Sequence, residues 1–482
     1  MFRRTKIVAT VGPASDSKEM LDTLIHAGVD VFRLNFSHGD YATKAQVIEN
    51  IRNLSKEHEH AVAILGDLQG PKIRTGLMAG GSMPLSAGSE VVVTTREVLG
   101  EGNLIPTIYR GLPHDVKTGD RILLDDGLME LKVLGVEGDD VRCLVVTGGL
   151  LKDRKGINLP GAKVSAPALT EKDREDLQFC MEQRLDYVAL SFVRQESDVL
   201  QLREIIDAAG SPLRIIAKIE KPEAVLNFAA ILRASDGVMV ARGDLGVELN
   251  PEKVPLIQKR IIRSCNEAGK PVITATQMLE SMVNNPRPTR AETSDVANAI
   301  LDGTDAIMLS AETASGKYPV EAVSMMVQVA RDIENDPQLM AQCCKGPDGK
   351  NGLPNISEVI GMAACRAAES VKAAAILAFT QTGSTAALVS KYRPAQPIIA
   401  VTPSQEVRRR LALYAGVHAL RVDIEGDTES QILSVEAAVL DTGWLKNGEL
   451  VVITMGSPLS SPGTTNLMKV HRLHEPVADP KR

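Results

Sequence analysis

The stretch Asp236-Gly-Val-Met-Val-Ala-Arg-Gly-Asp-Leu-Gly-Val-Glu248 decides how the chain is expected to fold. Its apolar run, Val238 to Ala241, is too short for a helix and is typical of a parallel strand buried on both faces. Arg242-Gly-Asp244 follows at the carboxyl end. A charged pair around a bare glycine is costly in a core but suits an active-site rim, where a ligand approaches the backbone and the following amides bind an anion. The alternative is an ordinary turn with a solvated ion pair.

Composition limits the class of protein. The chain has 482 residues, of which 44% are hydrophobic and 24% charged, as in globular proteins of two or three domains. The net charge of -7 argues against binding to nucleic acid or to an anionic membrane. The sequence contains neither a signal peptide nor a membrane-spanning stretch, and its six cysteines form no spaced framework, so we expect a cytoplasmic protein.

Short apolar runs alternate with amphipathic segments along most of the chain, and eight such strand–helix units predict a (β/α)8 barrel. A doubly wound open sheet is the rival, but the sequence has no GxGxxG turn to support it. The barrel is expected to comprise residues 1–70 and 168–341. Its strands are predicted at 6–10, 29–36, 61–65, 186–192, 214–220, 236–242, 271–276 and 305–310.

Two further domains are expected. Residues 71–167 show no helical period but contain glycine-rich turns and short β-branched runs, which predict an all-β insertion after the third strand, in the form of a small barrel. A composition shift at 342–352 indicates a linker. Residues 342–482 then predict an independent α/β domain with strands at 373–380, 397–402 and 449–454.

Polar side chains recur at alternate positions near the predicted strand ends. Arg33, Asn35 and Ser37 form one such set, and Lys218 with Glu220 forms another. Residues two apart on a strand share a face, so on a barrel these side chains converge at one mouth. A single pair of this kind is equally consistent with a structural ion pair and with a functional site. Repetition at several strands favours a shared site for an anion and a metal.

The charges at these strand ends suit phosphoryl chemistry. Glu220 and Asp244 end consecutive strands, and two carboxylates with room for water are how proteins usually hold Mg²⁺. Lys218, Arg33 and Arg74 supply positive charge for a phosphoryl group or an oxyanion. A lone lysine on a barrel strand is also compatible with a Schiff base, as in an aldolase.

The chain resembles the pyruvate kinase family over essentially its full length, and the bacterial members in particular, which lack the additional N-terminal domain of animal forms. The motifs are specific because they occur together and in order. They are TKIVATVGPAS at 5–15, FRLNFSHG at 32–39, KGINLPG at 155–161, AKIE at 217–220, MVARGDLG at 239–246, ATQMLESM at 275–282, NPRPTRAE at 285–292 and MLSAET at 308–313.

The resemblance implies a catalytic barrel, a mobile β lid, a regulatory C-terminal domain and a homotetramer. It implies the last step of glycolysis, in which phosphoenolpyruvate and ADP give pyruvate and ATP. It also implies Mg²⁺, with Mn²⁺ as an alternative ion, held by Glu220 and Asp244. Lys218 would stabilise the phosphoryl group and the enolate, and Arg33 would hold the substrate phosphate. The substrate carboxylate would be held by Gly243, Asp244 and Thr276.

The remaining roles also follow from the resemblance. The nucleotide side would be lined by Thr10, Pro13, Asn35, Ser37, His38, Arg74 and Lys155. Arg74 would also assist catalysis. Lys155 would arrive with the lid, whose closure excludes water. A water relay that protonates the enolpyruvate would involve Thr276, Ser310 and Glu312, without a single assigned donor.

An effector site is expected in the C-terminal domain, where Thr380-Gln-Thr-Gly-Ser-Thr385 lies between a strand and a helix. Hydroxyls and amides at a helix N-terminus bind phosphate, although plain N-capping would use the same residues. The resemblance implies a phosphorylated sugar or nucleotide on Thr380, Thr382, Gly383, Ser384 and Thr385, facing a loop at 456–465. That loop lacks the tryptophan of members activated by fructose bisphosphate, so the identity of the effector stays open.

The chain departs from the family pattern after the third strand. Many members that need K⁺ carry Asp-Thr-Lys-Gly-Pro-Glu there, and this chain carries Asp67-Leu-Gln-Gly-Pro-Lys72. Lys72 places an ammonium where a glutamate would need K⁺ to offset its charge. Asn35, Ser37 and Asp67 keep part of the cation position. We therefore expect that K⁺ is not required, the alternative being that Lys72 is a solvated hinge residue.

Two other functions remain compatible with the sequence. A lysine-dependent barrel aldolase or lyase would form a Schiff base at Lys218 and would not need ADP. A non-catalytic sensor would bind a sugar phosphate through the C-terminal domain without catalysing a reaction. An assay for ATP and pyruvate separates these functions.

Overall fold

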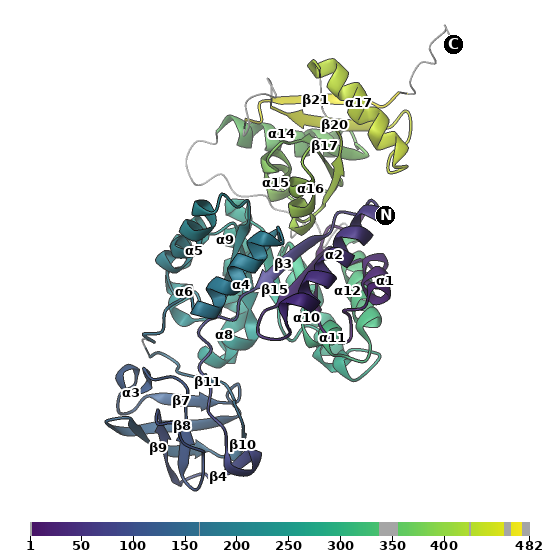
Figure 1. Cartoon of the computed structure of the whole chain (residues 1–482). Coiled ribbons are helices and arrows are strands. Elements are labelled where there is room, and N and C mark those ends of the chain that lie inside the picture. Colours follow the sequence, from purple (N-terminus) through teal and green to yellow (C-terminus); the bar gives the residue numbers. More distant parts are fainter. Residues whose placement is uncertain (1, 163, 337–354, 424–425, 457–463, 475–482) are drawn as a thin grey trace.

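The computed structural model describes residues 2–162, 164–336, 355–423, 426–456 and 464–474. Figure 1 shows a central barrel with a small β domain beyond one end and an α/β domain beyond the other. Within the described residues, no helix combines the length and the apolar character needed to cross a membrane. The expected linker at 342–352 lies outside the described residues.

Eight parallel strands close into the predicted barrel, in the order β1-β16-β15-β14-β13-β12-β3-β2. The strands are short and almost wholly buried, because helices cover their outer face and side chains fill the interior. They are β1 (Lys6–Val11), β2 (Val31–Asn35), β3 (Ala63–Asp67), β12 (Tyr187–Leu190), β13 (Arg214–Ile219), β14 (Gly237–Ala241), β15 (Val272–Ala275) and β16 (Ala306–Leu309).

The helices around the barrel begin where the sequence supplies caps. Thr170 and Thr289 form capping boxes with the acidic residue three positions later, and Asp40 caps the second helix. Two short helices follow β13 and are separated by Asn227. The helices are α1 (Lys18–Ala27), α2 (Tyr41–Glu57), α4 (Glu171–Glu182), α5 (Glu196–Ala208), α6 (Pro222–Leu226), α7 (Phe228–Ala234), α8 (Arg242–Glu248), α9 (Val254–Ala268), α10 (Arg290–Leu301), α11 (Ala311–Ala314) and α12 (Pro319–Glu334).

The insertion after β3 is all-β, as expected, but its strands form two sheets and not one closed barrel. Its own apolar core lies between the strands and is separate from the barrel core. A six-stranded sheet has the order β11-β7-β8-β9-β5-β6, and β10 pairs with β4. The strands are β4 (Ser82–Leu85), β5 (Glu90–Thr94), β6 (Leu104–Pro106), β7 (Arg121–Leu124), β8 (Met129–Glu137), β9 (Asp140–Thr147), β10 (Gly149–Lys152) and β11 (Ile157–Asn158), with a short helix α3 (Leu112–Asp115).

The C-terminal domain is a five-stranded sheet with the order β19-β18-β17-β20-β21, in which only the β20–β21 pair is antiparallel. The sequence predicted three of these strands and missed β19 and β21. The elements are α14 (Ile356–Ser370), β17 (Ala375–Phe379), α15 (Ser384–Lys391), β18 (Ile398–Thr402), α16 (Gln405–Arg410), β19 (Val417–Arg421), α17 (Thr428–Asp441), β20 (Leu450–Met455) and β21 (Leu467–Arg472).

Four aspartates repeat one contact where the barrel strands begin. Asp30, Asp186, Asp236 and Asp305 each precede an alternate strand, and each carboxylate accepts a main-chain N–H of a neighbouring strand. The distances to the amides of Ile7, Ile64, Ile215 and Val272 are 2.8, 2.9, 2.8 and 3.0 Å. Every one of these aspartates also pairs with at least one arginine. We call this set the aspartate clamps.

The C-terminal domain docks on the same end of the barrel, opposite the lid (Figure 1). Arg409 pairs with Asp186 at 2.8 Å and Arg393 pairs with Asp305 at 2.9 Å, so two aspartate clamps also hold this domain. Ala412 and Leu413 belong to the apolar cluster that fills the barrel interior. The amino end of the barrel is therefore sealed, which leaves the carboxyl end for chemistry.

Candidate active site

Three charged side chains, from β2, β3 and β13, meet at the carboxyl end of the barrel. Asp67 ends β3, and its carboxylate lies 2.6 Å from Arg33 Nε on β2 and 3.3 Å from Lys218 Nζ on β13. Burial alone would raise the pKa of Asp67, but the charges of Lys218 and Arg33 hold it below its ordinary value. Two cations are thus fixed at the mouth around one buried anion, and Arg33 also lines the cavity next to it.

Glu220 follows β13 and is buried beside Lys218. Its Oε1 lies 2.9 Å from Lys218 Nζ, yet among the described residues this oxygen makes no aligned hydrogen bond. Burial raises the pKa of Glu220, and the nearby charge of Asp244 raises it further against the opposing effect of Lys218. This buried oxygen is already paired with the Lys218 ammonium, and the added negative charge of Asp244 favours a further cation at this position.

These two residues fit a divalent metal ion. Glu220 and Asp244 offer the carboxylate oxygens that Mg²⁺ prefers, and Asp244 is only partly buried, which leaves room for water and substrate oxygens. Asp244 lies in the first turn of α8, which begins directly after β14. The strand–glycine–acid stretch therefore lies at the carboxyl end of β14, where α8 begins.

Sequence reasoning missed two residues that hold this centre together. Ser191 Oγ accepts a hydrogen bond from Lys218 Nζ at 2.8 Å and donates to the Leu68 carbonyl at 2.6 Å. The Phe192 amide donates to Glu220 Oε2 at 2.7 Å, and its φ of 56° is in the left-handed region. Both residues end the strand predicted at 186–192 and directly follow β12, so their place at a barrel strand end was the available signal.

The loop after β15 is held by Arg242. Its guanidinium donates to the carbonyl oxygens of Ala275 at 3.2 Å and Thr276 at 2.7 Å and pairs with Asp295. The Gly243 amide donates to Thr276 Oγ1 at 2.7 Å, and Thr276 has a φ of 69°. The structure thus brings Gly243 and Thr276 together, while Arg242 positions the backbone of the loop.

A cavity of about 620 Å³ brings together most residues expected on the nucleotide side. The opening is formed by the ends of β1 and β2 and by the segment after β16. Thr10 is fixed inside it, because its hydroxyl donates to the Leu309 carbonyl at 2.8 Å and accepts from Arg33 at 3.0 Å. The expected residues that line it are Thr10, Pro13, Arg33, Asn35, His38 and Ser310.

The residues of the expected water relay divide into two groups. Thr276 lines a cavity beside Gly243, and Ser310 lines the cavity at the ends of β1 and β2. Glu312 is fully buried, and its oxygens accept the main-chain N–H groups of Leu279 at 3.1 Å and Ser310 at 2.7 Å. Glu312 therefore orders the loops that carry the other two residues.

Arg74 and Lys155 lie in the lid segment and not at the barrel mouth. Arg74 donates to the Arg154 carbonyl at 3.1 Å, and Lys155 pairs with Asp125 at 2.8 Å. Neither residue lines the cavity that contains Thr10 and His38. The structure thus leaves these two expected nucleotide residues apart from the rest.

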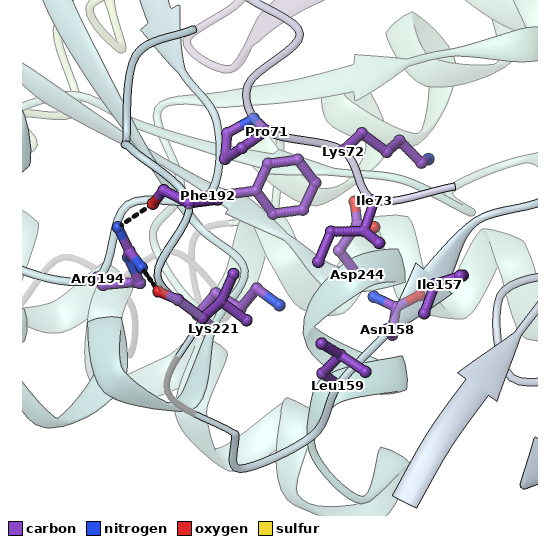
Figure 2. Close-up of a pocket in the computed structure, with 12 residues that line it drawn as sticks. Pro71, Lys72, Ile73, Ile157, Asn158, Leu159, Phe192, Arg194, Lys221 and Asp244 are labelled. Carbon is purple, nitrogen blue, oxygen red and sulfur yellow. Dashed lines mark hydrogen bonds between the residues drawn. The ribbon is translucent and has the colours of Figure 1, made fainter. Parts of the chain in front are cut away.

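Lys72 lies at the junction of lid and barrel, in a small cavity that Asp244 also lines (Figure 2). The three residues of the expected monovalent-cation position lie elsewhere: Asn35 pairs in register with Asp67, and the Ser37 amide donates to Asn35 Oδ1 at 3.0 Å. No contact among the described residues joins Lys72 to these three. In this conformation Lys72 lines the same cavity as Asp244, but its ammonium points away from that carboxylate (Figure 2).

The expected effector residues form the turn between β17 and α15. Thr380 and Thr385 are buried and hydrogen-bonded, Thr380 to the Gly383 amide at 2.9 Å and Thr385 to Thr465 at 3.0 Å. Thr382 and Ser384 are exposed, with their hydroxyls 3.1 Å apart. Residues 457–463 of the facing loop lie outside the described residues.

The fold and the site define a class: barrel enzymes that handle an anionic substrate with clustered cations and paired carboxylates. Within that class, the family description "Pyruvate kinase, barrel domain" matches residues 2–323, and "Pyruvate kinase, alpha/beta domain" matches residues 358–471. The chain belongs to the pyruvate kinase family, whose members are phosphotransferases.

Individual proteins support this membership. The chain is 49% identical to a pyruvate kinase of Geobacillus stearothermophilus and 46% identical to one of Staphylococcus aureus (strain USA300). Each match covers 99% of this chain and 82% of the relative. A crystal structure of a pyruvate kinase from Cryptosporidium parvum superposes with a TM-score of 0.91 at 41% identity, covering 98% of this chain and 96% of that one.

Proposed function

We propose that the barrel mouth transfers the phosphoryl group of phosphoenolpyruvate to ADP, with Mg²⁺ or Mn²⁺ held by Glu220 and Asp244. The observation that carries this assignment is the buried Glu220 oxygen, which has no aligned hydrogen bond, lies 2.9 Å from Lys218 Nζ and feels the negative charge of Asp244. When bound, the metal supplies positive charge to the oxygens of the transferring group. The family membership supports the same substrates.

The cations around Asp67 determine where the substrate lies. Arg33 is placed to hold the phosphoryl oxygens, and Lys218 is placed to stabilise the charge that develops on the enolate oxygen. The Gly243 amide and the Thr276 hydroxyl, which now bond to each other at 2.7 Å, can turn to the substrate carboxylate. The chain thereby holds both anionic groups of a small substrate.

The nucleotide and the proton relay are assigned from the cavities. ADP takes the cavity at the ends of β1 and β2, with Thr10, Pro13, Asn35 and His38 along it and Ser37 directly before His38 in the chain. Arg74 and Lys155 reach it when the lid closes, which also excludes water from the transfer. Thr276 and Ser310 carry the water relay to the enolpyruvate, positioned by Glu312.

We further propose that the enzyme does not require K⁺. Leu68 is buried and has no side-chain oxygen for a cation, and the carboxylate of Asp67 is already paired with Arg33 and Lys218. Lys72 brings a fixed positive charge to the junction that Asp244 lines. The remaining part of the cation position, formed by Asn35, Ser37 and Asp67, therefore does not need a bound K⁺ for activity.

Regulation, assembly and location complete the proposal. A phosphorylated sugar or nucleotide binds at the exposed hydroxyls of Thr382 and Ser384 and activates a homotetramer. The cytoplasm, where glycolysis takes place, is the setting. Cys143, Cys180, Cys265 and Cys365 support it, because these four described cysteines are free and buried.

The test is a coupled assay for ATP and pyruvate from phosphoenolpyruvate, ADP and Mg²⁺. We expect turnover in the wild type and a fall of about 10²-fold or more in Glu220→Gln, since a metal ligand is lost. Glu204→Gln, a matched change at an exposed helix position, should leave the rate unchanged. Substrate trapped by borohydride at Lys218 without ADP would support the lyase, and effector binding without turnover would support the sensor.

A further inference from the structure

A second cluster of metal-ligating side chains lies on the barrel exterior, where α1 and α2 end. Asp22 and His26 are one turn apart on α1, so they share a face, and His58 caps the C-terminus of α2. One ligand atom from each side chain lies within 4.8 Å of the other two, and no other group of three such residues is found among the described residues. Nothing in the proposed transfer uses these side chains.

The cluster is arranged around the carboxylate of Asp22. Its Oδ1 lies 2.6 Å from His58 Nε2 and 3.3 Å from His26 Nδ1, and the two imidazole rings meet edge to face with centroids 4.4 Å apart. His26 Nδ1 also lies 3.0 Å from the carbonyl oxygen of Asp22. Ligating histidines typically give their other ring N–H to such an acceptor, which here leaves Nε2 of His26 for a metal.

The surroundings suit a small cation. His26 lies in the last turn of α1 and His58 is the C-cap of α2, and helix C-termini favour positive charge. The side chains are 38%, 62% and 27% exposed for Asp22, His26 and His58, so an ion can enter without opening the fold. In a tetrahedral zinc site the ligand atoms lie about 3.3 Å apart, a spacing that rotation of these exposed side chains can reach.

We propose that Asp22, His26 and His58 bind one divalent transition-metal ion of the Zn²⁺ class, with water completing the coordination. Two imidazoles and one carboxylate select such an ion over Mg²⁺, which prefers an all-oxygen shell. The chain thus offers two chemically distinct metal positions: carboxylates at the barrel mouth, and imidazoles on its exterior.

Metal at this position would tie two consecutive barrel helices together close to the C-terminal domain. The Asp22 and His26 ligands come from α1 and His58 comes from α2, so the ion bridges the two helices. The residue after His58 is Glu59, whose carbonyl oxygen accepts a hydrogen bond from Arg408 of the C-terminal domain. Binding should therefore stiffen this part of the boundary between the barrel and the C-terminal domain.

The experiment is a Zn²⁺ titration of the full-length, chelator-treated protein by calorimetry, with saturating Mg²⁺ present to cover Glu220 and Asp244. We expect one Zn²⁺ per chain, with a dissociation constant that rises about tenfold or more in His26→Gln and in His58→Gln. His114→Gln, at an exposed position of the lid, is the matched control and should bind like the wild type. Thermal unfolding without metal checks that each variant is folded.

A second readout is the visible absorption of Co²⁺ in the same position. The wild type should show the d–d bands of a nitrogen-containing site, and Asp22→Asn should weaken them. The proposal is overturned if the wild type binds Zn²⁺ no more tightly than about 1 mM. It is equally overturned if the His26→Gln/His58→Gln double variant binds like the wild type. The cluster would then be a hydrogen-bonded contact between helix ends.

Discussion

Lys218 holds its ammonium between two buried carboxylates. Burial alone would lower the pKa of Lys218, but the charges of Asp67 and Glu220 raise it above its ordinary value, so the residue is a permanent cation at neutral pH. A cation that matters most as charge develops on the substrate should act on kcat more than on binding.

We therefore expect Lys218→Met to lower kcat by about 10²-fold or more while phosphoenolpyruvate binding, measured by calorimetry, stays detectable. Lys259→Met, which removes an exposed ion-pair partner of Asp302, should keep full activity. An unchanged kcat in Lys218→Met would show that the lysine serves only as the structural partner of Asp67 and Glu220.

Lys72 leads to a prediction about monovalent cations. The wild type should keep nearly full activity in buffer free of K⁺ and Na⁺, with ionic strength held constant by a bulky organic cation. Lys72→Glu, alone or with Leu68→Thr, should make the rate depend on added K⁺, because the substitution places a carboxylate beside Asp244. Lys72→Met is the matched control that removes the charge without adding an anion. A wild type that is inert without K⁺ and restored by it would contradict the proposal.

At the scale of single residues, the sequence predicted those site residues whose spacing follows the two-residue period of a strand. Arg33, Lys218 and Glu220 were recognised because alternate positions on a strand share a face, and the structure places them at one mouth. The partner roles of Ser191 and Phe192 and the main-chain contacts of Glu312 were not predictable. These roles depend on loop conformation, including a left-handed residue, which has no period in sequence.

At the scale of elements, the aspartate clamps join the beginnings of the barrel strands. One part of the motif can be seen in the sequence, because each aspartate directly precedes a buried strand. The main-chain N–H that donates to each carboxylate belongs to another strand, so this partner can be identified only from the fold. The strands missed in the C-terminal domain, β19 and β21, are its edge strands and carry partly exposed residues, so the continuous apolar run that revealed the others is absent.

The clamp at Asp30 has a consequence for stability against acid. Burial alone would raise the pKa of Asp30, but Arg3 and Lys6 hold it below its ordinary value. A carboxyl whose pKa is lower in the folded state stabilises the fold above its unfolded pKa, near 3.9, and this contribution is lost as the pH falls towards the folded value. Acid should therefore weaken the pairing of β1 with its neighbours.

The measurement is urea unfolding, followed by circular dichroism, of the wild type and Asp30→Asn between pH 6 and pH 3. We expect the variant to be less stable by roughly 1–3 kcal/mol at pH 6, with the difference shrinking as the pH approaches 3. Asp207→Asn, at an exposed helix position, should show no such difference. A difference for Asp30→Asn that is the same at both pH values would mean that the ionised carboxylate is not the stabilising form.

At the scale of the whole molecule, the effector turn and the catalytic mouth lie on opposite sides of the docking surface (Figure 1). A signal between them crosses this docking surface, which includes the contacts of Asp186 with Arg409 and of Asp305 with Arg393. We expect a sigmoidal response to phosphoenolpyruvate that a sugar phosphate or a nucleoside monophosphate relieves. Thr382→Ala with Ser384→Ala should abolish the relief and keep the basal rate, whereas Ser434→Ala, at another exposed hydroxyl, should do neither. Activation that persists in the double variant would place the effector elsewhere.

The insertion that forms the lid also affects how the chain is made. During synthesis, β3 can pair with β12 only after the lid segment between them has been made. Lys6 of β1 can pair with Ala306 of β16 only after that last barrel strand has been made. At ordinary rates of synthesis, the lid segment delays the pairing of β3 with β12 by roughly 10 s, and the outer edge of β3 remains unpaired during this time. The lid has its own core and its sheets pair only among themselves, so it can fold on the ribosome meanwhile. We expect nascent chains to need protection from edge-to-edge association until the last barrel strand emerges.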